Sequence, residues 1–262
     1  MSVSKKLVWG ASSHVGYSRT INEDGVFCKD LSEDTSLFII ADGEGSLSSS
    51  LQPAYLAIYE IEEMIQRLWD EDSEFLLSNV SILLRESVMV ANKVIGAFSK
   101  ANQEKYAGFS ASLSVCLLHK NELHFVHTGN TRIYLIRKHP QDGFPNIMKL
   151  TRDHTKATVL LDDGIITEFQ YYSHPGKLSL TSSIGVFTDP ELQQFDITLR
   201  PEDILLMTTD GIHYALQPDP MAQLIMESDN CDTAVNALIQ ASIMEKYIDN
   251  MSAIMIYLLP DE

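Results

Sequence analysis

The sequence has few cysteines, little basic charge and no long apolar run. Its three cysteines, Cys28, Cys116 and Cys231, are far apart and form no CxxC pair, which argues against a disulfide framework and a structural zinc site. Only 19 Lys and Arg stand against 36 Asp and Glu, so the formal net charge is −17. Because nucleic acid and anionic lipid both attract basic surfaces, this balance predicts neither nucleic acid nor a membrane as a partner.

Apolar stretches and common catalytic motifs are missing as well. No apolar run approaches the roughly 20 residues that span a bilayer, and residues 1–9 contain no signal-peptide core, so we expect a cytoplasmic protein. The sequence has no GxxxxGKS or GxxxxGKT phosphate loop, no HExxH and no GxSxG. No cysteine has an arginine six positions later, so the usual phosphatase built on a thiolate nucleophile is not expected either.

Hydrophobic periodicity predicts both helices and strands. A helix should begin near Pro53, a second should run from about Glu74 to Lys100, and a third should lie near residues 232–247 with Asp232 as its N-cap. Strands are expected at residues 37–41, 204–207 and 253–259, and as a meander over 111–118, 123–128 and 131–137, with turns at Lys120-Asn121 and Gly129-Asn130. Residues 138–149 are expected to form a loop. Strands that pair in sequence order favour antiparallel sheets with helices outside, an α+β fold. No repeat or linker interrupts the chain, so we expect one domain over residues 1–262.

Acidic residues stand beside several of these predicted strands. Asp42 and Asp210 each follow an apolar run and precede a glycine, Asp249 precedes another run, and the pair Glu23-Asp24 precedes a further strand. Carboxylates gathered at one end of neighbouring strands would repel one another unless a cation neutralised them. Oxygen ligands of this kind suit Mg²⁺ or Mn²⁺ rather than zinc. Taken singly, however, each Asp-Gly is also a common turn dipeptide, and Glu23-Asp24 is also an ordinary surface pair.

Six motifs, in this order and spacing, resemble the metal-dependent serine/threonine protein phosphatases, the PPM or type 2C family. The resemblance extends from about Gly10 to Leu259 and is closest to the compact bacterial members. The motifs are Arg19-x-x-Asn22-Glu23-Asp24, Leu37 to Gly45, Gly129-Asn130-Thr131-Arg132, Leu150 to His154, Thr209-Asp210-Gly211 and Asp249-Asn250.

This resemblance implies an αββα sandwich, in which two antiparallel sheets are flanked by helix pairs. It implies an enzyme, a protein serine/threonine phosphatase acting on phosphoserine and phosphothreonine in a phosphorylated protein substrate. The attacking water would be bridged between two Mg²⁺ or Mn²⁺ ions. Residues 155–181 would be the variable flap beside the active site.

The resemblance also implies a role for each acidic position. Asp42 would bridge the two ions, the Gly43 carbonyl would bind one, and Asp210 and Asp249 would bind the other. Glu23 and Asp24 would hold ions through water, and Arg19 would bind the substrate phosphate with its planar guanidinium.

Three positions depart from the family pattern. Asn130 stands where the bacterial members have an Asp that helps to bind a third ion, so the hypothesis is that two ions suffice here or that a third binds weakly. Glu44 occupies the position of a general acid in some members and is a possible acid here, although a solvated carboxylate is the alternative. Ser46 replaces a glycine. Asn130 and Ser46 motivate a second hypothesis, a catalytically weak regulatory or phosphoprotein-binding module on the same fold, and a phosphatase for small phosphoesters is a third.

Overall fold

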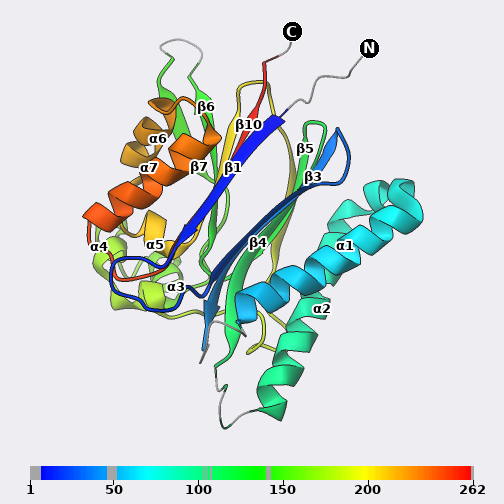
Figure 1. Cartoon of the computed structure of the whole chain (residues 1–262). Coiled ribbons are helices and arrows are strands. Elements are labelled where there is room, and N and C mark those ends of the chain that lie inside the picture. Colours follow the sequence, from blue (N-terminus) through cyan, green and yellow to red (C-terminus); the bar gives the residue numbers. More distant parts are fainter. Residues whose placement is uncertain are drawn as a thin grey trace.

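Two β-sheets lie face to face with helices on both outer sides. The structure is a computed structural model, and it describes residues 7–45, 52–102, 104, 106, 108–139 and 143–260. The two sheets run through the middle of the molecule, with α1 and α2 on one side and α6 and α7 on the other (Figure 1). This arrangement confirms the predicted αββα sandwich. Ser46 lies outside the described residues.

Within the described residues each sheet has five strands, and neighbouring strands in both sheets are antiparallel. The first sheet has the order β1 (Leu7–His14), β10 (Met251–Leu258), β9 (Ile204–Thr208), β6 (Arg132–Lys138) and β7 (Pro145–Lys149). The second has the order β2 (Asp24–Asp30), β3 (Thr35–Glu44), β4 (Ser110–His119), β5 (Glu122–Thr128) and β8 (Gln193–Thr198). β1 and β10, the first and last of the described strands, are therefore direct neighbours, with Leu7 opposite Leu258 and His14 opposite Met251.

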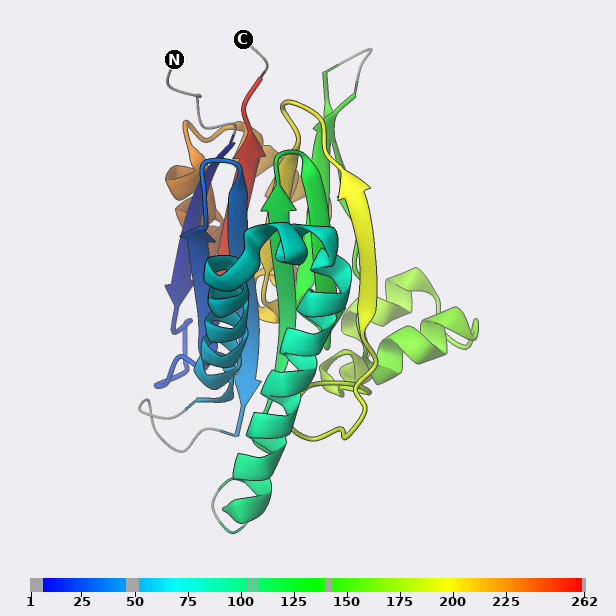
Figure 2. The same ribbon diagram turned by 90° about the vertical axis from the view of Figure 1, so that its right-hand side faces the viewer.

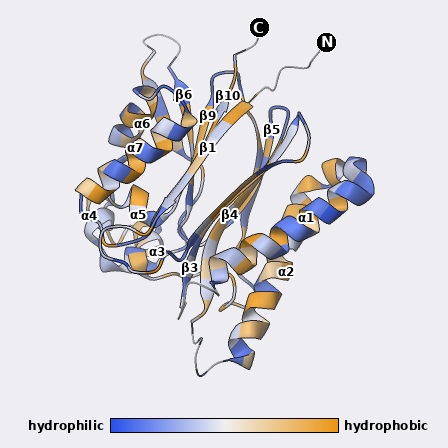
Figure 3. Ribbon diagram, viewed as in Figure 1, coloured by the Kyte–Doolittle hydropathy of each residue, from blue (hydrophilic) through white to orange (hydrophobic). Residues whose placement is uncertain are grey.

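The helices cover the outer faces of the sheets. α1 (Pro53–Ser78) and α2 (Val80–Ala101) pack on the second sheet, whereas α6 (Pro218–Met226) and α7 (Cys231–Met244) pack on the first. Figure 2 shows α1 and α2 side by side over their sheet. The helices carry both hydrophobic and hydrophilic residues (Figure 3), as expected for elements with one face on a sheet and one in water. No helix within the described ranges is both long enough and apolar enough to cross a bilayer.

Hydrophobic side chains fill the space between the sheets. Phe38 and Ile40 from β3 meet Leu205 and Met207 from β9 and Ile254 from β10, and all five are fully buried. In a strand, alternate residues point to opposite faces. Their neighbours Leu37 and Ile39 therefore point the other way, into the layer covered by α1 and α2. A strand buried on both faces reads as a continuous apolar run, which is why residues 37–41 could be recognised in the sequence.

Helix boundaries differ from the prediction at three places. Pro53 is the first residue of α1, as predicted, but this helix continues to Ser78 across a distortion at Asp72. The break comes at Asn79, so the predicted second helix over residues 74–100 was wrong in its start. The third helix begins at Cys231, and its N-cap is Asn230 rather than Asp232. Asn230 and Thr233 form a reciprocal capping box there.

The strands and their connections differ from the prediction more than the helix boundaries do. The hairpin of β4 and β5 exists, but Gly129-Asn130 does not close a second hairpin, because β5 and β6 belong to different sheets. The segment 129–131 instead carries the chain across the sandwich. The predicted loop at 138–149 contains β7, and β8 was not predicted. Nor were α6 and the short helices α3 (Lys156–Asp162), α4 (Glu168–Ser173), η1 (Pro175–Leu178) and α5 (Asp210–His213).

Candidate active site

The acidic residues expected to act together lie at one end of the sandwich. They surround a cavity of about 290 Å³ to which both sheets contribute. Asp42 comes from β3, Asp210 is the first residue of α5 after β9, and Asp249 precedes β10. Glu23, Gly43 and Arg19 line the same cavity, together with Glu44, Gly45, Ser110, Ala111, Ser112, Asn130, Leu178 and Leu180.

Asp24 lies behind this cavity and is buried. It stands directly opposite Asp42 in the β2–β3 pair, and its Oδ2 accepts hydrogen bonds from Thr209 Oγ1 at 2.8 Å and from Ser252 Oγ at 2.7 Å. Burial raises the pKa of Asp24 to about 7, and the charges of Asp249 and Glu23 add to it against the effect of the two hydrogen bonds. Asp24 therefore ties the second sheet to the first beneath the acidic cluster.

The carboxylates at the cavity raise one another's pKa values. Burial, followed by the charges of Asp249 and Asp24, raises the pKa of Asp210 to about 8. For Asp42, burial and then the charges of Asp210 and Asp24 raise the pKa well above its ordinary value. Anions held together in this way favour a neutralising cation, and their oxygen atoms are suitable ligands for Mg²⁺ or Mn²⁺.

The acids surround a space rather than converging on a point. Among the residues that the structure describes, no group of three or more His, Cys, Asp or Glu side chains forms a ready chelating cluster. One of these acids already has a partner, because Asp249 Oδ2 accepts a hydrogen bond from Arg19 Nη2 at 3.0 Å. Arg19 Nε also donates to the Ile248 carbonyl. Part of the Arg19 guanidinium is therefore already engaged, and its remaining N–H groups are the ones available to another anion.

Gly211 allows α5 to come close to the segment that carries Asp249. A Cβ atom at this position would lie only 1.9 Å from the carbonyl oxygen of Asn250, so any side chain would push the two segments apart. The neighbouring acids Asp210 and Asp249 depend on this close approach. The glycine after Asp210 is thus explained by the contact and not by a turn alone.

Asn130 joins the cluster as a neutral partner. It is buried, and its Nδ2 donates to Asp210 Oδ2 at 3.1 Å, while its Oδ1 finds no partner among the described residues. Glu44, the possible general acid, is solvent-exposed at the edge of the same cavity. His213, three residues after Asp210, is buried and hydrogen-bonded to Thr208.

Asn250 belongs to one of the six motifs, but the sequence predicted no role for it. Its Oδ1 accepts from the Glu23 amide, and its Nδ2 donates to the carbonyls of Val15 and Ile21, all at 2.9 Å. These bonds hold the loop that carries Arg19 and Glu23 against the start of β10. The signal available in the sequence is the place of Asn250 directly after Asp249 within one motif.

A buried ionic network joins residues 155–181, the expected flap, to β6. Arg132 and Asp153 form a bidentate ion pair, and Tyr134 and Tyr171 add hydroxyl groups to it. Tyr171 lies on α4, within residues 155–181, whereas Arg132 begins β6 two residues after Asn130. The motif residues Arg132 and Asp153 thus have a structural partnership that the sequence did not reveal.

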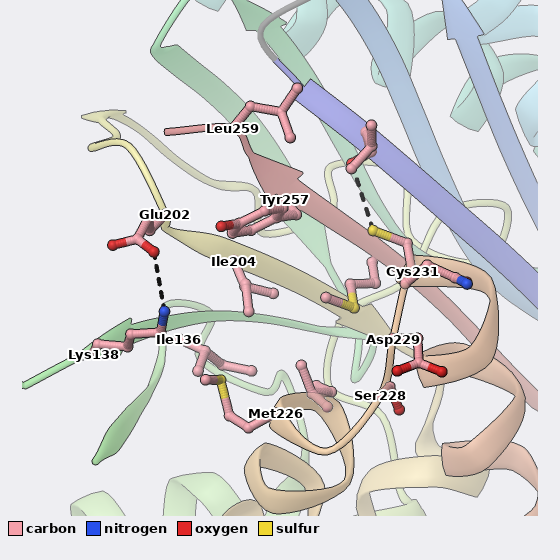
Figure 4. Close-up of a pocket in the computed structure, with 14 residues that line it drawn as sticks. Ile136, Lys138, Glu202, Ile204, Met226, Ser228, Asp229, Cys231, Tyr257 and Leu259 are labelled. Carbon is pink, nitrogen blue, oxygen red and sulfur yellow. Dashed lines mark hydrogen bonds and ion pairs between the residues drawn. The ribbon is translucent and has the colours of Figure 1, made fainter. Parts of the chain in front are cut away.

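A second cavity of about 330 Å³ lies at the opposite end of the first sheet, under α6 (Figure 4). Its walls are mainly apolar and include Ile136, Ile204 and Tyr257. The ion pair of Lys138 and Glu202 stands at its edge. Its acidic lining residues are Glu202, which is paired with Lys138, and Asp229. The other end gathers five acids at one cavity, so the acidic cavity is the candidate site for chemistry.

Comparison with known proteins gives one consistent result. The sequence model of the family described as protein phosphatase 2C matches residues 12–244. The serine/threonine phosphatase stp of Listeria monocytogenes is 22% identical over 244 residues, which are 92% of each chain. The crystal structure of the serine/threonine phosphatase PstP/Ppp of Mycobacterium tuberculosis superimposes with a TM-score of 0.81 at 23% identity, over 97% of this chain and 99% of that one. A PstP catalytic domain in complex with two manganese ions gives a TM-score of 0.77 at 22% identity, over 97% and 98% of the two chains.

Proposed function

The chain belongs to the protein phosphatase 2C family, and from this premise we propose that it hydrolyses phosphoserine and phosphothreonine in proteins with the help of two Mg²⁺ or Mn²⁺ ions. One observation carries the proposal. Asp42, Asp210 and Asp249 come from distant parts of the chain and from both sheets, yet they surround one cavity. Their mutual repulsion gives them little reason to gather except to hold cations. The two manganese ions in the PstP catalytic domain support the same number here.

Each acidic residue has a distinct place in the proposed site. Asp42 would bridge the ions, the Gly43 carbonyl would bind one of them, and Asp210 and Asp249 would bind the other. Glu23, which lines the cavity, and Asp24, which lies behind it, would act through water. Asn130 would orient Asp210 by its hydrogen bond, and its neutral amide is the reason to propose two ions rather than a tightly bound third.

The chemistry is a direct transfer of the phosphoryl group to water. Two bound divalent ions would supply a water of lowered pKa as the nucleophile and would neutralise phosphate charge. The N–H groups of Arg19 that are not engaged by Asp249 and Ile248 would hold the phosphate oxygens. As the new P–O bond forms and the bond to the substrate oxygen breaks, that oxygen needs a proton. Glu44, exposed at the cavity edge, would donate it.

The flap and the cellular setting complete the proposal. Residues 155–181 contribute Leu178 and Leu180 to the cavity wall, which supports a role for this segment in substrate preference. We further propose that residues 1–262 act as a single domain, in the cytoplasm, without nucleic acid or membrane as partner. The charge of −17 supports the absence of the last two.

The direct test is Mn²⁺-dependent hydrolysis of a phosphothreonine peptide. Wild-type protein should release phosphate only with added Mn²⁺ or Mg²⁺, and Asp42→Asn and Asp210→Asn should each lose at least about 99% of the activity, a loss of several kcal/mol in transition-state stabilisation. Asp229→Asn, which removes an acid at the apolar cavity, is the matched control and should keep full activity. Folded wild-type protein with no turnover in millimolar Mn²⁺ would favour the regulatory module, and equal rates in excess chelator would exclude the two-ion mechanism.

A further inference from the structure

A narrow groove runs along the outer surface of α2, beside the segment Gly185–Thr188. Its volume is about 240 Å³, and none of its residues lines the acidic cavity. One face of α2 forms the first wall, because residues three, four and seven apart share a face of a helix. The groove is lined by Asn92, Lys93, Gly96, Ala97, Lys100, Gly185, Val186, Phe187 and Thr188.

The groove is built into the fold. Asn92 is buried, and its Oδ1 accepts from the Gly185 amide at 2.7 Å while its Nδ2 donates to the carbonyls of Phe187 and Thr188. Gly185 has φ +96°, and a Cβ there would lie 2.5 Å from Ile95 and 2.7 Å from the Phe109 carbonyl. One buried amide and one glycine therefore fix the second wall against α2, so a ligand would meet a formed surface.

Lys93 and Lys100 place two positive charges on the first wall. Both are exposed, and within the described ranges neither has a carboxylate close enough for an ion pair. Arg132 and Arg137, by contrast, have such partners. On the opposite wall Val186 is 54% exposed and Phe187 36% exposed. In a chain of net charge −17, two unpaired lysines beside exposed apolar side chains suit an acidic segment that also carries an apolar residue.

The groove and the acidic cavity share one stretch of chain. Ala111 lines the cavity and exchanges two backbone hydrogen bonds of 3.0 Å with Ile184, the residue before the groove wall. Leu180, four residues earlier, also lines the cavity. Figure 2 shows α2 on the side facing the viewer, with the segment that leads into β8 beside it. The backbone pairing of Ala111 with Ile184 joins the wall of the groove to the wall of the cavity, with Ser182, Ser183 and Ile184 buried between them.

We propose that this groove docks an acidic, partly apolar segment of the phosphoprotein substrate, next to the residue that is dephosphorylated. The inference rests on the proposed phosphatase function. Lys93 and Lys100 are about 10 Å apart along the helix axis, at about 1.5 Å per residue. In a peptide with the polyproline II conformation, which has three residues per turn, residues three apart lie on the same side and about 9 Å apart, at about 3.1 Å per residue. The segment recognised best has two acidic residues at this spacing with an apolar residue between them.

The test compares substrates that share one phosphothreonine core. One peptide carries a Glu-Leu-Ser-Glu arm, placed before the phosphothreonine in one version and after it in another, and the control peptide has a Ser-Gly arm. The double variant Lys93→Glu/Lys100→Glu should lower kcat/KM for the better acidic-arm peptide about five- to tenfold, through KM, as expected for two exposed ion pairs. Arg85→Glu makes the same kind of charge change on an exposed site of α2 outside the groove and should have no such effect.

A second variant tests the groove without changing charge. Ala97→Trp would fill the space between the walls, and because Ala97 is exposed, the protein should still fold. It should also remove the preference for the acidic arm. Hydrolysis of 4-nitrophenyl phosphate should be unchanged in all three variants, which keeps the two proposals separate. If wild-type protein turns over 4-nitrophenyl phosphate yet shows no arm preference, or if Arg85→Glu matches the double variant, the groove proposal is wrong. If wild-type protein hydrolyses neither compound, the phosphatase proposal fails first.

Discussion

Replacing Asp153 by Asn should destabilise the protein far more than an ordinary substitution. In the structure the Arg132 side chain is 4% exposed and that of Asp153 is fully buried. Asp153 Oδ2 accepts from Arg132 Nη2 and from the Tyr171 hydroxyl, both at 2.6 Å, and Oδ1 accepts from Arg132 Nε at 3.0 Å. Lys149 adds a fourth contact at 3.3 Å. The variant would leave a buried guanidinium without its counter-ion.

The pKa of Asp153 shows how strongly the neighbouring cations stabilise its ionised carboxylate. Burial alone would raise its pKa, but the charges of Arg132 and Lys149, with the hydrogen bonds from Arg132, outweigh burial and hold the pKa below its ordinary value. A depressed pKa in the folded state means that the stabilisation is fully present above the unfolded pKa, near 4, and is lost only as the pH falls through the folded value. The loss caused by Asp153→Asn should therefore be nearly constant between pH 5 and 8.

The expected magnitude is about 3–5 kcal/mol, the usual cost of removing one partner of a buried ion pair. The adjacent pair Arg152–Asp162 supplies a matched control, because its side chains are 42% and 50% exposed. Asp162→Asn should cost no more than about 1 kcal/mol. The double variant Arg132→Met/Asp153→Leu should be more stable than Asp153→Asn, since it removes the unpaired charge.

The assay is equilibrium unfolding in urea at pH 7, followed by circular dichroism and by tryptophan fluorescence. Asp153→Asn should shift the midpoint strongly with an unchanged slope, because the slope reflects the surface exposed on unfolding. A loss below about 1 kcal/mol, or an equal loss in Asp162→Asn, would refute the view that Arg132 and Asp153 act as a desolvated pair.

Three further predictions concern the acidic cavity and the thiols. In chelator, the free energy of unfolding should fall as the pH rises from about 4 to 8, because burial and neighbouring charge raise the folded pKa of Asp24 to about 7 and that of Asp210 to about 8. Urea titrations in Mn²⁺ should show a smaller change with pH. Asn130→Asp should lower the free energy of unfolding in chelator by at least about 1 kcal/mol, because the new carboxylate would face Asp210, and it should add a second rise in activity at high metal concentration. If wild-type protein already shows this second rise and loses it on substitution of Asn130, the two-ion hypothesis is wrong. Iodoacetamide at pH 7.5 should leave activity intact, since burial raises the pKa of Cys28 to about 12 and that of Cys231 to about 11; rapid inactivation would point to a reactive thiol.

The sequence predicted the architecture better than the connections. Six motifs identified the family, and the αββα sandwich followed from that resemblance. Local pattern alone placed β5 and β6 in one meander, because neighbouring strands usually pair, and nothing in Gly129-Asn130 shows that the chain changes sheets there. The strands β7 and β8 were missed because they lie at sheet edges, where exposed positions remove the apolar run.

For the site, the sequence predicted which residues belong to it but little of how they are arranged. Asp42, Asp210 and Asp249 do surround one cavity, while their roles as ligands, like those of Glu23, Asp24, Gly43 and Arg19, stay predictions. The three hydrogen bonds of Asn250 join residues more than 90 positions apart, and so do the hydrogen bonds of Asn92 to Gly185 and Phe187. Such contacts depend on the finished fold, and no local pattern reports them.

The pairing of β1 with β10 also bears on when the enzyme can first act during its synthesis. β10 starts at Met251, and Asp249 stands just before it, so the first sheet lacks its second strand until residues 249–258 have left the ribosome. Contacts between such distant segments form slowly. Before then β1 and β9 present unpaired edges that can recruit other chains. The nascent protein should therefore be inactive and prone to aggregate until β10 joins the sheet, and the same event that closes this sheet brings Asp249 to the cavity.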